Sequence, residues 1–153
     1  MVKVGGKAPS FCLKDEKDKE YCLKDYSGKK LVIYFYPRDN TPGCTIEAND
    51  FTKLKSSFDK EGVVILGVSK DSAKSHKKFI EGQKLKIILL SDEDSSMQKK
   101  FGVWKKKKFM GREYMGTDRS TFLIDEKGKI LKIWESVSAK GHAEKVLEFI
   151  KGM

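Results

Sequence analysis

The sequence predicts a single α/β domain, a sandwich of helices around a mixed central sheet. Short apolar runs typical of buried strands alternate with segments whose apolar residues recur every three or four positions, as on one face of a helix. The chain then closes with two short strands around a glycine turn and one more helix, which implies a mixed sheet. No repeat or low-complexity linker interrupts the 153 residues, so we expect residues 1–153 to fold as one domain.

The first elements are predicted to be a small N-terminal hairpin and a buried strand. The apolar segments 11–13 and 21–23 flank a charged stretch at 14–20, a pattern typical of two short strands and their turn. A β-branched and aromatic run follows at 31–36 and ends at Pro37, which cannot donate a hydrogen bond within a sheet. We therefore expect the hairpin first and then the buried strand.

Helices and strands alternate along the rest of the chain. Phe51, Leu54 and Phe58 are spaced by three and four residues and predict an amphipathic helix that ends near Gly62. The later elements are a strand at 63–68, a lysine-rich helix at 72–82, a strand at 87–90, a short helix at 95–101, strands at 121–124 and 130–134 with a turn at Gly128, and a helix at 142–150. We expect the four lysines at 105–108 to lie in a solvated loop.

The chain is basic, with 32 Lys and Arg against 22 Asp and Glu and a net charge of +10. Such a surface attracts nucleic acid or anionic membranes, and the lysines at 105–108, between Trp104 and Phe109, are the best candidates for nucleic-acid binding. Most other lysines mix with acids along predicted helices, as solvated helix faces do. A basic nucleic-acid or protein-binding module, with a purely structural Cys44, stays open as the alternative to an enzyme.

No membrane or export segment is visible in the chain. Its longest apolar run, at 31–36, is far shorter than the roughly 18 residues that a spanning helix needs. The N-terminus lacks the apolar core of a signal peptide, and three widely spaced cysteines do not suggest a disulfide-stapled secreted scaffold. We expect a soluble cytoplasmic protein that uses no membrane and is a monomer or a weak dimer.

The segment P-R-D-N-T-P-G-C, residues 37–44, joins the first buried strand to the first long helix and carries the candidate chemistry. With Thr41 as the N-cap, Pro42 falls at the first helical position, where its missing N–H costs nothing. Cys44 then falls at the third position, beside unpaired backbone N–H groups and the positive end of the helix dipole. Both effects favour the thiolate over the thiol, as in other reactive cysteines at helix N-termini.

A packed and inert cysteine is the other interpretation of Cys44. Phe51, Leu54 and Phe58 follow it at helical spacing, so its side chain shares their apolar face. The two prolines, the threonine and the glycine just ahead of it weaken this interpretation, because they cost helix and strand propensity that a purely structural turn would not need to lose. The pattern therefore favours a reactive thiol.

The motif P-x-x-x-T-x-x-C in this segment resembles the peroxidatic motif of peroxiredoxins. The longer stretch Y-F-Y-P-R-D-N-T-P-G-C-T-x-E-A is similar to the bacterioferritin comigratory protein (peroxiredoxin Q) subfamily. The resemblance continues through A-P-S-F, F-G-V-W-K-K-K-K-F-M-G-R-E-Y-M-G and T-D-R-S-T-F-L-I-D-E-K-G-K-I. It implies a thioredoxin-like three-layer sandwich with an N-terminal β-hairpin, and a thioredoxin-dependent peroxidase that reduces hydrogen peroxide and organic hydroperoxides.

The resemblance also implies a role for each of five residues. Cys44 resembles the nucleophile that becomes a sulfenic acid. Thr41 resembles the hydroxyl that holds the thiolate and the attacked oxygen, and Pro37 resembles the residue that shields the pocket from water. Arg119, in T-D-R-S-T, resembles the guanidinium that stabilises the thiolate and the peroxide, and Glu47 is expected to orient it. Without the resemblance, Arg119 would be interpreted as an exposed charge at a strand end.

The chain departs from the family at the second, resolving cysteine. In many relatives it lies five residues after the nucleophile, where this chain has Asn49, and the helix after the second strand, another family location, has none either. The resemblance then implies that thioredoxin or a low-molecular-weight thiol resolves the sulfenic acid. If the hairpin centres on Lys17, Cys12 and Cys22 lie opposite each other, and whether they form a disulfide, stay reduced or resolve Cys44 stays open.

Metal ions and cofactors are not expected. The chain has no C-x-x-C, no H-E-x-x-H and no glycine-rich phosphate-binding motif. The missing C-x-x-C also disfavours a general thiol–disulfide oxidoreductase. His76 and His142 fit no catalytic motif, and we expect both on helix surfaces.

Overall fold

The computed structural model describes residues 2–153, so Met1 of the expected domain 1–153 lies outside the described residues. Its strands are β1 (Cys12–Lys14), β2 (Glu20–Cys22), β3 (Lys30–Phe35), β4 (Val63–Ser69), β5 (Ile88–Ser91), β6 (Trp104–Phe109), β7 (Arg112–Thr117), β8 (Ser120–Ile124) and β9 (Ile130–Trp134). Its helices are α1 (Pro42–Lys60), α2 (Ala73–Gln83), α3 (Ser96–Lys100) and α4 (His142–Lys151), with a 3₁₀ helix η1 (Leu23–Tyr26). Apart from η1, β6 and β7, this is the predicted order of elements.

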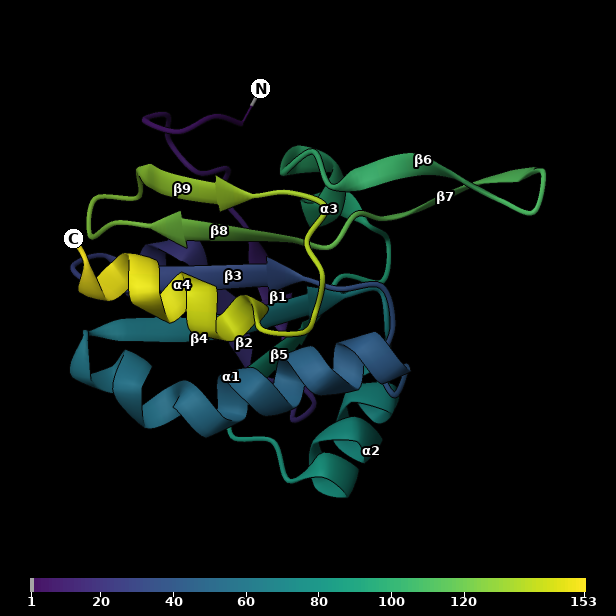
Figure 1. Ribbon diagram of the computed structural model, residues 1–153, viewed down its shortest axis with the longest axis horizontal. Coiled ribbons are helices and arrows are strands. Elements are labelled where there is room, and N and C mark those ends of the chain that lie inside the picture. Colours follow the sequence, from purple (N-terminus) through teal and green to yellow (C-terminus); the bar gives the residue numbers. More distant parts are fainter. Residues whose placement is uncertain (1) are drawn as a thin grey trace.

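Seven strands form one mixed sheet in the order β2-β1-β5-β4-β3-β8-β9 (Figure 1). β3, β4 and β5 run parallel, whereas β8 is antiparallel to β3 and β1 is antiparallel to β5. The buried run 31–36 lies in and just after β3, near the middle of the sheet. Because the segment 37–44 follows β3, it emerges at the edge where the parallel strands end, the usual place for sites in α/β sheets.

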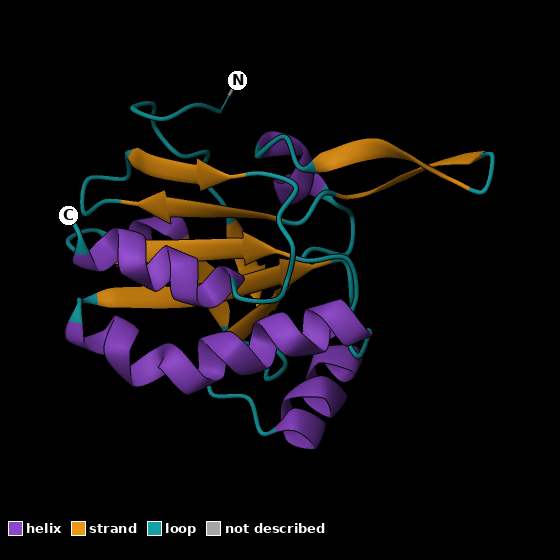
Figure 2. Cartoon of the chain, viewed as in Figure 1, coloured by secondary structure: helices purple, strands orange, loops and turns teal. Residues whose placement is uncertain are grey.

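Helices cover both faces of the sheet (Figure 2). α1, α2 and α4 pack on one face, and α3 and η1 pack on the other. The alternation of side chains along β3 divides the core, since Val32 and Tyr34 face α1 and α4 while Ile33 and Phe35 face α3. This arrangement confirms the predicted three-layer α/β sandwich. None of the helices within residues 2–153 combines the length and apolar content needed to cross a bilayer.

The predicted loop at residues 105–108 is wrong. These lysines lie in β6, which pairs with β7 as a hairpin that extends away from the sheet (Figure 1). Their side chains are exposed or half-buried. A strand covered on neither face needs no apolar alternation, so the period-two signal that marks a half-buried strand is missing here.

Both histidines are buried, which contradicts the prediction that they lie on helix surfaces. His76 is 0% exposed, and its Nδ1 lies 2.7 Å from Asp39 Oδ2. His142 Nε2 lies 2.7 Å from Thr121 Oγ1. Burial, helped by the positive charge of Arg119, lowers the pKa of His142 to about 4, so this ring is neutral at pH 7. Polar partners inside the fold make such burial tolerable, and a single sequence does not reveal them.

The N-terminal hairpin has the register that opposes Cys12 and Cys22. The two residues form a disulfide, with their Cα atoms 4.1 Å apart. Cys44 is the free cysteine of the described residues, and it is buried. The structure therefore shows Cys12 and Cys22 bonded to each other, one of the arrangements that the sequence left open.

Gly67 in β4 tests how tightly the central strands pack. A Cβ atom added there would lie 2.7 Å from Leu89 Cδ2 and 2.8 Å from Tyr34 Cζ, closer than ordinary contacts allow. We expect Gly67→Ala to lower the free energy of unfolding by about 1–3 kcal/mol, because the surrounding core must shift. The measurement is the midpoint of urea unfolding.

Gly82→Ala in α2 is the matched control. No heavy atom lies within 4 Å of the added Cβ, so this variant should gain up to about 1 kcal/mol from helix propensity. If Gly67→Ala were as stable as the wild-type protein, the close packing of β4 against Tyr34 would be wrong.

Candidate active site

α1 begins at the residues that the motif predicts. Thr41 has extended backbone angles at the N-cap, Pro42 is the first helical residue and Cys44 is the third. The Thr41 side chain does not cap the helix, because its Oγ1 donates to the Arg38 carbonyl oxygen at 2.9 Å. The first N–H groups of α1 thus have no side-chain cap, and the Cys44 sulfur lies in the turn where the helix dipole is positive.

Arg119, in the connection between β7 and β8, bridges Cys44 and Glu47. Its Nη2 donates to Cys44 Sγ at 3.3 Å, and its Nη1 donates to Glu47 Oε1 at 2.7 Å. Cys44 and Glu47 are three residues apart on α1, so their side chains lie on one face and a single guanidinium reaches both. The structure thus brings together three of the five predicted site residues, and Arg119 is no exposed strand-end charge.

The bridge lies in a largely dry environment. Glu47 is 0% exposed, and the Arg119 side chain is 16% exposed. Burial raises the pKa of Glu47 to about 7, and Arg119 offsets only part of that rise. Burial alone would lower the pKa of Arg119, but Glu47 and Cys44 outweigh it and the pKa is raised. The guanidinium therefore stays charged, while the carboxyl group exchanges its proton near neutral pH.

Thr41 and Pro37, the other two predicted site residues, make no hydrogen bond to Cys44, Arg119 or Glu47. Thr41 is half-buried and makes no hydrogen bond to Cys44 within the described structure, contrary to the expectation that it holds the thiolate. Because its one proton is donated to the Arg38 carbonyl, its oxygen is left as an acceptor. Pro37 is exposed at the carboxyl end of β3. Both residues belong to the segment that leads into α1, yet neither touches the Cys44–Arg119–Glu47 group through a hydrogen bond.

Gly43 is a site residue that the sequence analysis did not assign. A Cβ atom at this position would lie 3.1 Å from Arg119 Nη2 and 3.8 Å from Ala139 Cβ. The absent side chain therefore leaves room for the guanidinium beside Cys44. A glycine in the first turn of a helix, where it weakens the helix, was the available signal.

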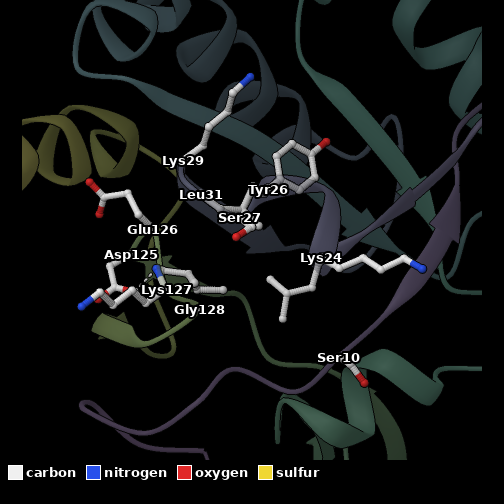
Figure 3. A pocket seen from close by; sticks show the side chains of 12 residues that line it. Ser10, Lys24, Tyr26, Ser27, Lys29, Leu31, Asp125, Glu126, Lys127 and Gly128 are labelled. Carbon is white, nitrogen blue, oxygen red and sulfur yellow. Dashed lines mark hydrogen bonds between the residues drawn. The ribbon is translucent and has the colours of Figure 1, made fainter.

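A cavity of about 510 Å³ lies elsewhere in the protein (Figure 3). Its lining includes Lys29 and Leu31 at the start of β3, Tyr26 of η1, and the turn 125–128 between β8 and β9. Cys44 instead follows the opposite, carboxyl end of β3. None of the five predicted site residues lines this cavity, so it has no part in the chemistry of Cys44.

Comparison with known proteins identifies the family. The family model described as the AhpC/TSA family matches residues 4–133. The chain is 46% identical over 152 residues to Peroxiredoxin Bcp of Bacillus subtilis, a match that covers 99% of this chain and 97% of the relative. It is 39% identical over 150 residues to Peroxiredoxin Bcp of Escherichia coli, covering 98% and 96% of the two chains.

Solved structures agree with these relatives. A mutant PrxQ of Xylella fastidiosa superposes with a TM-score of 0.94 at 36% identity, covering 99% of this chain and 97% of that one. The Xanthomonas campestris bacterioferritin comigratory protein, studied for its alkyl peroxide reduction activity, gives a TM-score of 0.89 at 42% identity and covers 93% and 90%. These likenesses favour the enzyme over a binding module with a structural Cys44. The chain belongs to the AhpC/TSA family, as a thiol peroxidase of the peroxiredoxin Bcp type with the thioredoxin-like fold.

Proposed function

We propose that Cys44 is the peroxidatic nucleophile and that it reduces hydrogen peroxide and organic hydroperoxides through a sulfenic acid. The observation that carries this proposal is the contact of 3.3 Å between Arg119 Nη2 and Cys44 Sγ in the first turn of α1. A guanidinium beside the sulfur stabilises the thiolate, which is the nucleophilic form of cysteine. The alkyl peroxide reduction activity studied in the Xanthomonas campestris relative supports the same substrate class.

The reaction transfers one oxygen atom to sulfur. The Cys44 thiolate attacks the distal oxygen of the hydroperoxide, so an S–O bond forms while the O–O bond breaks and the sulfur loses two electrons. The departing alkoxide or hydroxide takes a proton and leaves as alcohol or water. Arg119 is the donor beside the sulfur that can stabilise the negative charge developing on the leaving oxygen.

Ionising the thiol cannot supply most of the rate. A free thiol with a pKa near 8.5 is about 3% thiolate at pH 7, so complete ionisation gains only about thirtyfold. The remaining acceleration has to come from stabilising the transition state, where each well-placed charged donor contributes a few kcal/mol. Arg119 therefore contributes more to the rate by stabilising the leaving oxygen of the peroxide than by ionising the Cys44 thiol.

The other predicted residues assist at the same place. The Thr41 oxygen, whose proton is held by the Arg38 carbonyl, accepts the O–H of the hydroperoxide and so orients it. Pro37 limits the access of water from the carboxyl end of β3. Glu47 orients Arg119 through the Oε1–Nη1 bond of 2.7 Å.

An external thiol completes the cycle. Position 49 is Asn, whose Nδ2 donates to Gln83 Oε1 at 3.2 Å, and Cys12 and Cys22 are bonded to each other. β1 is three strand positions away from β3, which corresponds to about 14 Å across the sheet. Thioredoxin or a small thiol attacks the Cys44 sulfenic acid to give a mixed disulfide and water, and a second thiol then releases Cys44.

Cys44→Ser tests the proposed nucleophile. The variant should consume no peroxide, because serine forms no sulfenic acid and its hydroxyl is a weak nucleophile at neutral pH. The measurement is the loss of hydrogen peroxide after one equivalent is mixed with the reduced protein in the absence of any added thiol. The double variant Cys12→Ser/Cys22→Ser is the control and should consume that equivalent at the wild-type rate. Normal consumption by Cys44→Ser would show that the nucleophile is misassigned.

Resolution by an external thiol gives a separate prediction. After one equivalent of peroxide and no added thiol, the intact mass should increase by one oxygen atom, and a sulfenic-acid trap should label Cys44. Repeated turnover should require thioredoxin with its reductase, or a small thiol. Excess peroxide should drive Cys44 to sulfinic acid, because no internal thiol competes. A disulfide between Cys44 and Cys12 or Cys22 would contradict this route.

Glu47→Gln is expected to change how stability depends on pH. Because burial raises the pKa of Glu47 from 4.5 to about 7, the folded protein binds this proton more tightly than the unfolded chain does. The stability from Glu47 is therefore fully present below about pH 4.5 and is lost as the pH rises through about 7. We therefore compare the free energies of unfolding of the wild-type protein and Glu47→Gln by urea denaturation at each pH. The difference, wild type minus variant, should fall as the pH rises across this interval.

His142 acts in the opposite direction, and the comparison cancels it. The pKa of His142 is lowered to about 4, so its contribution is present above 6.5 and is lost as the pH falls towards 4. The wild-type protein and Glu47→Gln both contain His142, so the difference between their free energies of unfolding reports on Glu47. A difference that stayed constant or grew with pH would show that Glu47 does not retain its proton in the fold.

A further inference from the structure

Asp39 lies in the middle of the loop 37–41, and its carboxylate is buried. Its Oδ1 accepts the Tyr36 hydroxyl at 2.6 Å, and its Oδ2 accepts the Ser75 hydroxyl at 2.8 Å. The same Oδ2 lies 2.7 Å from His76 Nδ1. A buried carboxylate without partners would be costly, and these contacts from Tyr36, just after β3, and from α2 satisfy it. The loop that carries Pro37 and Thr41 is thereby fastened to the first turns of α2.

His76 extends this fastening to β5. Its Nε2 lies 3.0 Å from the Leu90 carbonyl oxygen, on the side of the ring opposite Asp39. A carbonyl oxygen only accepts, so Nε2 is the donor in this contact, and the other ring nitrogen, Nδ1, faces Asp39. The ring is fully buried and is held at both nitrogens, which fixes its position between the loop and the sheet.

Asp71 holds the backbone of the same loop. Its Oδ2 accepts the Asp39 N–H at 2.8 Å and the Ser69 hydroxyl at 2.7 Å. Asn40, which follows Asp39 in the loop, has φ of 62°, in the left-handed region that non-glycine residues rarely adopt. Such a conformation persists where its surroundings enforce it. The side chain and the backbone of Asp39 together provide that enforcement.

We propose that Asp39 and His76 are positioning residues of the peroxidase, because they hold the loop 37–41 where Pro37 and Thr41 meet the hydroperoxide. The proposal rests on the proposed function of Cys44. Neither residue hydrogen-bonds the sulfur, which accepts a hydrogen bond from Arg119 Nη2.

The pair therefore acts on the peroxide rather than on the thiol. Releasing the loop displaces the Thr41 hydroxyl and the Pro37 ring. The contact of 3.3 Å between Arg119 and Cys44 does not involve the loop and remains. Loss of the pair should slow peroxide attack much more than it slows attack by Cys44 on a neutral alkylating agent, which has no O–O bond to orient.

Asp39→Ala tests this split. Displacement of a positioning group by about 1 Å can cost on the order of 100-fold, so we expect peroxide reduction to be about 10 to 100 times slower. Alkylation by iodoacetamide should stay within about threefold of the wild-type rate, since it depends on the thiolate alone. Both rates are measured as single turnovers of Cys44 by stopped flow and mass spectrometry.

Two further variants separate positioning from mere stability. Asp39→Asn should recover most of the peroxide rate, because its amide can donate to His76 Nδ1 and accept from the Tyr36 hydroxyl. The double variant Asp39→Ala/His76→Ala should be little slower than Asp39→Ala, because residues that act through one contact are not additive. A fully additive loss would overturn the assignment of the two residues to a single anchor.

Asp15→Ala is the matched structural control. Asp15 is 6% exposed, as is Asp39, and it also accepts a tyrosine hydroxyl, that of Tyr21 at 3.1 Å, but it lies in the N-terminal hairpin. Its loss should lower the melting temperature and leave the peroxide rate unchanged. The anchor is overturned if Asp39→Ala reacts with peroxide at the wild-type rate, or if an equally destabilised Asp15→Ala slows as much. Activity in Cys44→Ser would instead overturn the proposed function.

Discussion

The contact of the Arg119 guanidinium with both Cys44 and Glu47 is the interaction on which the rest of the site depends. It joins residues 75 positions apart in the chain. It exists because β8 is the antiparallel neighbour of β3, with Ser120 paired to Phe35 at the carboxyl end of β3. The residue just before β8 therefore lies beside the segment that leads from β3 into α1. A different strand order would leave a helix N-terminus with a cysteine and no cation.

This arrangement carries a cost that a purely structural core would avoid. The carboxyl group of Glu47 is buried, its Oε2 has no hydrogen-bond partner within the described residues, and the Tyr34 hydroxyl lacks one as well. Burying a charge costs several kcal/mol, which a single ion pair does not fully repay. The raised pKa of Glu47 reflects that imbalance. Unsatisfied groups and shifted pKa values of this kind gather at functional sites, where the fixed arrangement of charges that the reaction needs lowers the stability of the fold.

Two separate sets of contacts hold the first turn of α1 and the loop that precedes it. Arg119, just before β8, contacts the first turn, and the proposed anchor of Asp39 and His76 ties the preceding loop to α2 and β5. The two sets of contacts share no residue, so the charge on the sulfur and the position of the peroxide can be adjusted separately. The Cys12–Cys22 disulfide lies on β1 and β2 at one edge of the same sheet and belongs to neither set.

The sequence by itself determined the features that depend on neighbours in the chain. Pro42 and the cysteine two residues after it set the start of α1, alternating apolar runs set the strands, and the opposition of Cys12 and Cys22 followed from the length of the hairpin. The resemblance to peroxiredoxins added Arg119, which local pattern alone would have left as an exposed charge. Only the tertiary structure decided the burial of His76, the room left by Gly43, the partner of the Thr41 hydroxyl and the strand at 105–108. The burial of His76 and the room beside Gly43 depend on which distant segments pack together, and the free energy of such contacts does not appear in the spacing of residues along one strand or helix. The Thr41–Arg38 hydrogen bond and the β6–β7 hairpin are local, but they leave no apolar pattern in the sequence.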